Sequence, residues 1–285
     1  MKKLICACAF LCALLPQPGF ATEKKGLPQI FANIGQPPEG KVRNQLPLEE
    51  FTDKYERKNF PPAEKGRKAL AYFWFQPAPP YPEGLTFPLV VVLHGATGKS
   101  YAGKFLITSA MQMAYPAFIL VPAIPEDSVW AQTKPMTLPD GRTVASMGYE
   151  ALPDVVALIK DLQSQYPIDG RRIYVMGCSE GGIGTFGAVR HYPDVFAAAV
   201  PLAGAWMPED SPQMTKVPLW AFHGAKDSVI PAYLSRDITT LIHQYGGKAY
   251  YTEFPDMNHQ CPSPQFYSPQ MWEWMFRQIK ITPHE

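Results

Sequence analysis

Residues 173–188 read IYVMGCSEGGIGTFGA, and the stretch GCSEG at 177–181 fits the pattern G-x-S-x-G. In this pattern a serine lies on a sharp turn between a strand and a helix, with its hydroxyl exposed. The apolar run before the pattern is typical of a buried strand, and the small residues after it are typical of a helix packed closely on that strand. The alternative is a glycine-rich turn with an incidental serine. The strand–turn–helix context favours Ser179 as a nucleophile.

Strand-type and helix-type patterns alternate on both sides of this stretch. Short apolar runs such as LVVVL at 89–93 and AFILV at 117–121 are typical of strands buried on both faces. The expected strands are 69–75, 89–93, 117–121, 173–176, 196–201, 219–222 and 249–254, and the expected helices are 152–165, 184–191, 232–245 and 269–278. This alternation predicts an α/β fold with a mostly parallel central sheet and helices on both faces. In such folds, ligands bind at the carboxyl ends of the strands.

Two polar residues at strand ends are candidate partners of the serine. A serine nucleophile needs a base to take its proton and a carboxylate to hold the tautomer of that base. Asp227 follows the strand expected at 219–222, and His259 follows the strand expected at 249–254, in the order serine, acid, histidine. Asp256 is the rival acid, but it lies only three residues before His259, so their loop would have to fold back. The predicted catalytic residues are therefore Ser179, Asp227 and His259.

The tetrahedral intermediate of acyl transfer also needs hydrogen-bond donors for its oxyanion. The first expected donor is the backbone N–H of Glu180, the residue after the nucleophile. The second is expected from the loop HGATG at 94–98, where the Ala96 N–H is the first candidate and the Thr97 N–H the second. His94 is expected to brace this loop and not to act as the base.

Composition excludes several function classes. The chain has 285 residues and a net charge of +1, which argues against nucleic acid or an anionic membrane as the main partner. With 46% hydrophobic residues the chain is not disordered, and its 31 prolines favour fixed loops over an all-helical bundle. No internal run reaches the roughly 18 apolar residues of a membrane span, so no stable membrane insertion is expected. No catalytic zinc spacing, phosphate loop or dinucleotide fingerprint occurs, so we expect no metal and no cofactor.

The N-terminus has the pattern of a secretory signal peptide over residues 1–21. Lys2 and Lys3 precede a short apolar core, and small residues before position 22 indicate cleavage after Ala21. The apolar core is too short for the alternative, a membrane anchor. We therefore expect a periplasmic or secreted protein whose loss of two lysines lowers the charge from +1 to −1. Residues 22–66 are expected to form a proline-rich arm, and residues 67–285 the catalytic domain.

The cysteines are informative once the leader is removed. Of the 5 cysteines, only Cys178 and Cys261 lie in the mature chain. Cys178 directly precedes Ser179, and Cys261 follows His259 by two residues. If the serine and the histidine meet, the two sulfurs come close together. In an oxidising compartment this predicts a Cys178–Cys261 disulfide, with two free buried thiols as the alternative.

Four stretches together resemble secreted α/β-hydrolase esterases of the polyhydroxybutyrate depolymerase, feruloyl esterase and prolyl-oligopeptidase-like branch. They are FPLVVVLHGATG at 87–98, the run from IDGRRIYVMGCSEGG to VPLAGAW at 168–206, VPLWAFHGAKDSVIP at 217–231 and YYTEFPDMNH at 250–259. The resemblance implies an α/β-hydrolase fold. Tannase-type and fungal feruloyl esterases bond the cysteines beside the catalytic serine and histidine, although here Gln260 separates Cys261 from His259. Those enzymes carry a large lid domain, whereas residues 204–217 leave room only for a loop, so no large lid and an open site are expected.

The expected activity is that of a secreted serine carboxylesterase acting through an acyl-enzyme intermediate. An open site suits a bulky, aromatic or polymeric ester. Trp130 and Trp206 follow expected strands and are candidate pocket walls, with ordinary loop anchoring as the alternative. Two other functions remain open: a serine peptidase of the prolyl-oligopeptidase type, and a non-catalytic binding module with a hydrolase fold.

Overall fold

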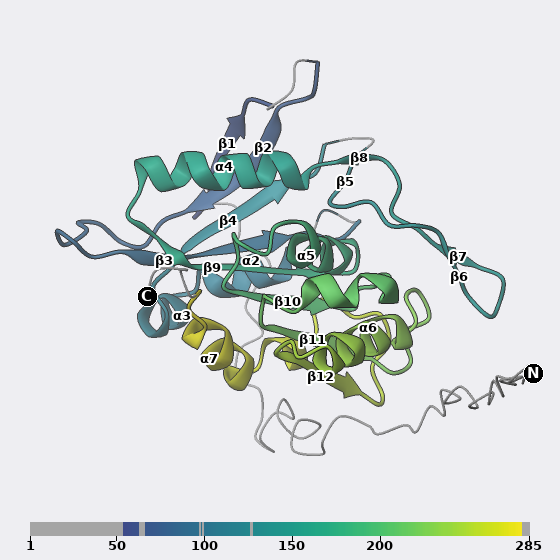
Figure 1. The fold of residues 1–285 in the computed structure, drawn as a ribbon. Helices are drawn as coiled ribbons and strands as arrows, with labels where there is room; N and C mark the ends of the chain where they lie inside the picture. Colours follow the sequence, from purple (N-terminus) through teal and green to yellow (C-terminus); the bar gives the residue numbers. More distant parts are fainter. Residues whose placement is uncertain (1–53, 63–65, 97, 99, 126–127, 281–285) are drawn as a thin grey trace, which may run out of the picture.

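An eight-stranded sheet runs through the computed structural model, which describes residues 54–62, 66–96, 98, 100–125 and 128–280 (Figure 1). In spatial order the strands are β1 (Glu56–Phe60), β2 (Leu70–Phe75), β4 (Phe118–Ala123), β3 (Phe87–Leu93), β9 (Ile168–Cys178), β10 (Ala198–Leu202), β11 (Leu219–Gly224) and β12 (Ala249–Phe254). Strand β2 pairs antiparallel with β1 and β4, and every other pair is parallel. The predicted mostly parallel sheet is confirmed.

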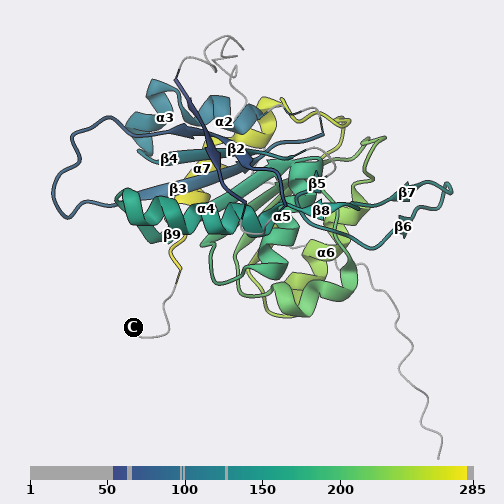
Figure 2. The same cartoon turned by 90° about the horizontal axis from the view of Figure 1, so that it is seen from above.

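Helices cover both faces of the sheet. One face carries α4 (Leu152–Gln165), α5 (Glu180–His191) and α6 (Tyr233–Gln244), and the other carries α2 (Tyr101–Leu106), α3 (Ser109–Ala114) and α7 (Pro269–Arg277). Figure 2 shows the two groups on opposite sides of the strands. The predicted helices on both faces are therefore confirmed, and the chain has the α/β-hydrolase fold.

The central strands are apolar throughout because each face of the sheet has its own core. In β3, Leu89, Val91 and Leu93 pack with the α4–α5–α6 layer, whereas Val90 and Val92 pack with the α2–α3–α7 layer. Successive side chains of a strand point to opposite faces, so a strand covered on both sides reads as a continuous apolar run. The continuous apolar run LVVVL in the sequence results from this burial on both faces.

Two short helices and one strand of the central sheet were not among the elements expected. The helices α2 and α3 are only six residues each, which is too short for a clear helical period. Strand β1 lies inside the segment 22–66 that the sequence predicts as an arm, and it pairs with β2 from Glu56 to Phe60. The central sheet therefore begins before residue 67. The predicted signal peptide and residues 22–53 lie outside the described residues.

The insertions between the described strands contain only small elements. Between β4 and α4 the chain forms two small ladders, β5 (Ser128–Val129) with β8 (Tyr149–Glu150) and β6 (Met136–Thr137) with β7 (Thr143–Val144). Between β10 and β11 it forms the single 3-10 helix η2 (Pro208–Met214). Across the described ranges the insertions build no large lid domain, as predicted. No helix within those ranges has the length and apolar character that a membrane span needs.

Candidate active site

Ser179 lies on a strained turn between the end of β9 and the start of α5. Its backbone has φ 61° and ψ −120°, a left-handed conformation that costs energy for any residue except glycine. A Cβ on Gly177 or Gly181 would overlap backbone atoms, including the Leu93 carbonyl of β3. Only glycine therefore fits at these two positions, which explains the pattern G-x-S-x-G in this chain.

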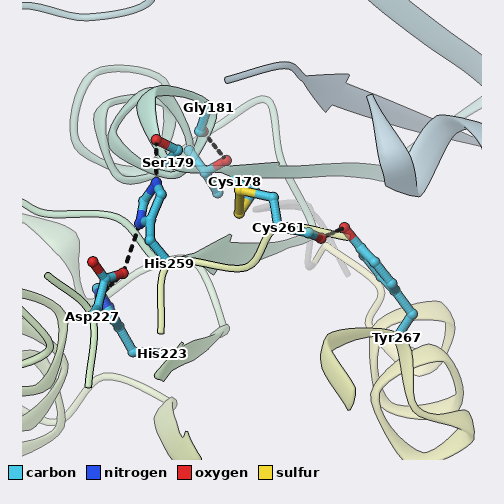
Figure 3. Close-up of a disulfide and its surroundings, with 9 residues drawn as sticks. Cys178, Ser179, Gly181, His223, Asp227, His259, Cys261 and Tyr267 are labelled. Carbon is cyan, nitrogen blue, oxygen red and sulfur yellow. Dashed lines mark hydrogen bonds and ion pairs between the residues drawn. A yellow bond between two sulfur atoms is a disulfide. The ribbon is translucent and has the colours of Figure 1, made fainter. Parts of the chain in front are cut away.

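Three side chains from separate strand ends form one hydrogen-bonded chain (Figure 3). The Ser179 Oγ lies 2.9 Å from Nε2 of His259, and Nδ1 of His259 lies 2.7 Å from Oδ2 of Asp227. A carboxylate only accepts hydrogen bonds, so Nδ1 carries the proton and Nε2 is free to accept the serine hydroxyl. The structure thus brings together the three residues predicted as a triad, in the geometry that general-base activation of a serine requires.

Asp227 is held from both of its oxygens. Oδ1 accepts the backbone N–H groups of Val229 at 2.9 Å and Ile230 at 2.8 Å, while Oδ2 faces His259 and His223. Burial opposes ionisation, but hydrogen bonds from His223, His259 and the Ile230 N–H outweigh it and hold the pKa of Asp227 well below its usual range. The carboxylate is therefore charged at neutral pH and can stabilise an imidazolium.

The rival acid lies elsewhere. The Asp256 side chain is 89% exposed and pairs with Lys226 at 2.7 Å. The hydrogen bond and the charge of Lys226 lower the pKa of Asp256, and its carboxylate lies in solvent, unlike the buried Asp227 carboxylate. The carboxylate that contacts the His259 imidazole is that of Asp227.

The loop after β3 lies directly against the serine. A Cβ on Gly95 would be 3.1 Å from the Cys178 carbonyl oxygen and 3.4 Å from the Ser179 Cβ. The Gly98 N–H donates to the Gly95 carbonyl at 2.9 Å, which closes a turn around the exposed Ala96. Ala96 thus directly follows a residue that lies against the serine turn, while Glu180 opens α5, where backbone N–H groups have no helical acceptor. Thr97, the alternative donor, lies outside the described residues.

His94 braces this loop, as expected. Its Nε2 accepts the backbone N–H of Ile124 at 3.0 Å, so the proton is on Nδ1, which donates to the Gly95 carbonyl at 2.8 Å. Burial lowers the pKa of His94 and keeps the ring neutral. Both nitrogens are engaged, so His94 is not available as a base.

The predicted disulfide between Cys178 and Cys261 is present (Figure 3). It joins the residue before Ser179 to the His259 loop across 83 residues of sequence, with the Cα atoms 5.7 Å apart. The Cys261 carbonyl also accepts the hydroxyl of the buried Tyr267 at 2.9 Å. The intervening Gln260 does not prevent the bond, and the histidine loop is fixed at both of these points.

Two further side chains of the site were missed in the sequence. His223 lies near the end of β11 and contacts the same Asp227 oxygen as His259. Asn258 Oδ1 accepts the backbone N–H groups of Ser228 at 2.9 Å and His259 at 2.8 Å, which joins the acid loop to the histidine loop. A polar residue four before the acid and another directly before the histidine were the only available signals, and neither has a meaning without the tertiary contacts.

The prediction of Trp130 and Trp206 as pocket walls is wrong, because both side chains are fully buried. Trp130 packs on Gly184 of α5 and donates its indole N–H to the His94 carbonyl at 2.9 Å. Trp206 packs near Gly187 and donates to Asp210 at 3.0 Å. The glycines of α5 leave room for these rings, so the two tryptophans anchor loops to the helix and offer no face to a ligand.

Comparisons with known proteins agree with this geometry. The sequence model of the family described as Esterase PHB depolymerase matches residues 72–216, about half of the chain. The chain belongs to this esterase family. The matched range includes the turn at Ser179 and the loop at 94–98, whereas Asp227 and His259 lie beyond it. No group of three or more potential metal-binding side chains occurs among the residues that the structure describes.

Individual relatives point the same way. Feruloyl esterase B of Neurospora crassa is 32% identical over 120 residues, and poly(3-hydroxyalkanoate) depolymerase C of Paucimonas lemoignei is 28% identical over 123 residues. Each alignment covers 41% of this chain, but only 38% and 28% of those two proteins. The crystal structure of a thermostable esterase superposes with a TM-score of 0.71 at 29% identity, over 81% of this chain and 64% of that one. The chain thus spans less than two thirds of the length of each of these relatives.

Proposed function

We propose that the protein is a serine carboxylesterase in which Ser179 is the nucleophile, His259 the general base and Asp227 the acid that orients His259. The observation that carries the proposal is the hydrogen-bonded chain from Ser179 Oγ through His259 to Asp227, with distances of 2.9 and 2.7 Å. Membership of the esterase family supports ester hydrolysis as the reaction.

The geometry fits a two-step acyl transfer. In acylation, Ser179 Oγ attacks the ester carbonyl carbon while His259 Nε2 takes the hydroxyl proton. The resulting oxyanion accepts hydrogen bonds from the backbone N–H groups of Glu180 and Ala96. His259 then gives the proton to the departing alkoxide, and the alcohol leaves. In deacylation, water loses a proton to His259 Nε2 and attacks the acyl carbon, and the proton returns to Ser179 as the acid leaves.

Asp227 contributes electrostatics rather than proton transfer. Its low pKa means that it stays ionised while His259 becomes positively charged in each transition state. Two backbone N–H groups hold its Oδ1 in place before substrate binds. The carboxylate and the two N–H groups that bind it are thus in place before the reaction starts. The free-energy cost of reorganising these groups in the transition state is therefore lower.

The substrate we propose is a bulky, aromatic or polymeric ester. The His259 side chain is 18% exposed, and the small elements inserted between the described strands form no large lid domain over it. The named activities of the relatives, on feruloyl and poly(3-hydroxyalkanoate) esters, fit this class. Secretion is part of the proposal, because the disulfide beside the serine suits an oxidising compartment.

A fluorophosphonate probe tests the proposal, because it reacts only with an activated serine. We expect labelling of the mature protein, none of the Ser179→Ala variant, and unchanged labelling of the control Ser164→Ala, whose serine is exposed on α4. Absence of labelling in folded, oxidised protein would instead favour a non-catalytic module. A matched ester and amide pair then separates esterase from peptidase, and faster turnover of the amide would contradict the ester assignment.

A further inference from the structure

Asp227 contacts a second imidazole besides that of His259. Its Oδ2 lies 3.1 Å from Nε2 of His223, and the same oxygen lies 2.7 Å from Nδ1 of His259 (Figure 3). His223 belongs to β11 and its side chain is completely buried, so no solvent reaches this contact. One carboxylate oxygen is therefore shared by two histidines.

The direction of the second hydrogen bond follows from the partners of the ring. His223 Nε2 faces the Asp227 carboxylate and, at 2.8 Å, the carbonyl oxygen of Ile230. Both partners only accept hydrogen bonds, so Nε2 carries a proton and donates it. His223 thus cannot take a proton at Nε2, and its role toward Asp227 is that of a hydrogen-bond donor.

The His223 ring is itself fixed from the helix layer. Its Nδ1 lies 2.9 Å from Oγ of Ser235 on α6, and the same Oγ lies 2.7 Å from the Gly204 carbonyl oxygen. Ser235 is fully buried. A continuous chain of polar contacts therefore runs from the half-buried Ser179 and His259 through the buried Asp227 and His223 to Ser235.

We propose that His223 is a positioning residue for the acid, which holds Asp227 Oδ2 in line with His259 Nδ1. The proposal rests on the proposed function of Ser179, His259 and Asp227. The two backbone N–H groups of Val229 and Ile230 hold only Oδ1, so they do not by themselves fix the position of Oδ2. The His223 N–H fixes the second oxygen, and because His223 touches no reacting atom it acts through Asp227 alone.

A pair of amide variants tests this role. In His223→Gln the side-chain nitrogen reaches the place of Nε2 and keeps the donor, whereas in His223→Asn the amide is too short to reach Asp227. With the disulfide intact and p-nitrophenyl acetate as substrate, we expect His223→Asn to lower kcat by about 10- to 100-fold, the effect of losing one hydrogen bond to a charged group, with KM nearly unchanged. His223→Gln is expected to keep a kcat at least about tenfold above that of His223→Asn. The matched control is His243→Asn, which alters an exposed histidine of α6.

The outcomes separate the two proposals. If the wild type neither hydrolyses the ester nor reacts with a fluorophosphonate, the proposed function is wrong and the role of His223 falls with it. If the wild type is active, the role of His223 alone is overturned when folded His223→Asn keeps its kcat, or when the Gln and Asn variants lose activity equally. Should His223→Asn not fold, Ser235→Ala decides: a lower kcat at unchanged KM supports the proposal, and an unchanged kcat overturns it.

Discussion

Cys178 and Cys261 are joined by a disulfide that lies between the nucleophile turn and the histidine loop. Cys178 is the last residue of β9, and Cys261 lies in the loop before η3 (Pro264–Tyr267). The bond therefore links a central strand of the sheet to a loop that no strand holds. The Tyr267 hydroxyl bonds to the Cys261 carbonyl at 2.9 Å and adds a second restraint. His259 therefore approaches Ser179 from a segment that is fixed covalently.

Removing the disulfide is expected to weaken both stability and activity. In Cys178→Ala/Cys261→Ala, the free energy of unfolding should fall by about 2–5 kcal/mol, because the unfolded chain regains the entropy of a long loop. The kcat should fall more than KM rises, since the His259 loop is less well placed. Chemical denaturation and steady-state kinetics measure the two effects. A reductant should affect the wild type and leave the double variant unchanged, and equal sensitivity of the two would contradict the explanation.

Replacing the acid separates the two candidate carboxylates. Asp227→Asn should reduce kcat by about 10⁴-fold, because a neutral amide can no longer fix the tautomer of His259 or stabilise its positive charge. Asp256→Asn is the matched control, since it alters an exposed carboxylate paired with Lys226, and its kcat should be close to that of the wild type. Both kcat values are measured in the ester assay. A large loss of kcat in Asp256→Asn alone would show that Asp256, and not Asp227, is the catalytic acid.

The low pKa of Asp227 predicts an acid-dependent loss of stability. Its pKa in the folded state lies below that in the unfolded chain, so the carboxylate stabilises the fold at every pH above its unfolded pKa of about 3.9. As the pH falls from there through the folded pKa, this contribution is lost. Urea denaturation between pH 6 and pH 3 should therefore show a steeper loss for the wild type than for Asp227→Asn. Parallel curves would show that Asp227 does not contribute.

Trp206 should matter for stability and not for substrate affinity. Trp206→Phe keeps a ring near Gly187 but loses the hydrogen bond to Asp210, which is worth about 1 kcal/mol. We expect a slightly lower free energy of unfolding and an unchanged KM for an aromatic ester such as a methyl ferulate. A large rise in KM at normal stability would show that the ring contacts substrate after all.

The local parts of the fold could be read directly from the residues. The turn at Ser179 needs Gly177 and Gly181 because the backbone of β3 lies against it. This requirement produces the recognisable pattern G-x-S-x-G in the sequence. The buried strands are continuous apolar runs because helices cover both faces of the sheet. The strand ends that carry Asp227 and His259 followed from the same patterns, as did the proximity of the two cysteines.

Contacts between distant segments were decided only by the tertiary structure. Strand β1 is polar and mostly exposed at the sheet edge, so nothing in its residues distinguishes it from a loop until it pairs with β2. Trp130 follows a strand as a pocket residue would, but Gly184 on α5 leaves the space that buries it. The sequence shows His223 only as a residue of an apolar strand. Its contacts with Asp227 and Ser235 exist only in the folded chain. The chain thus determined its elements and the identity of the reactive groups by local sterics and periodicity, whereas burial and hydrogen-bond partners depended on which surfaces meet when the layers pack.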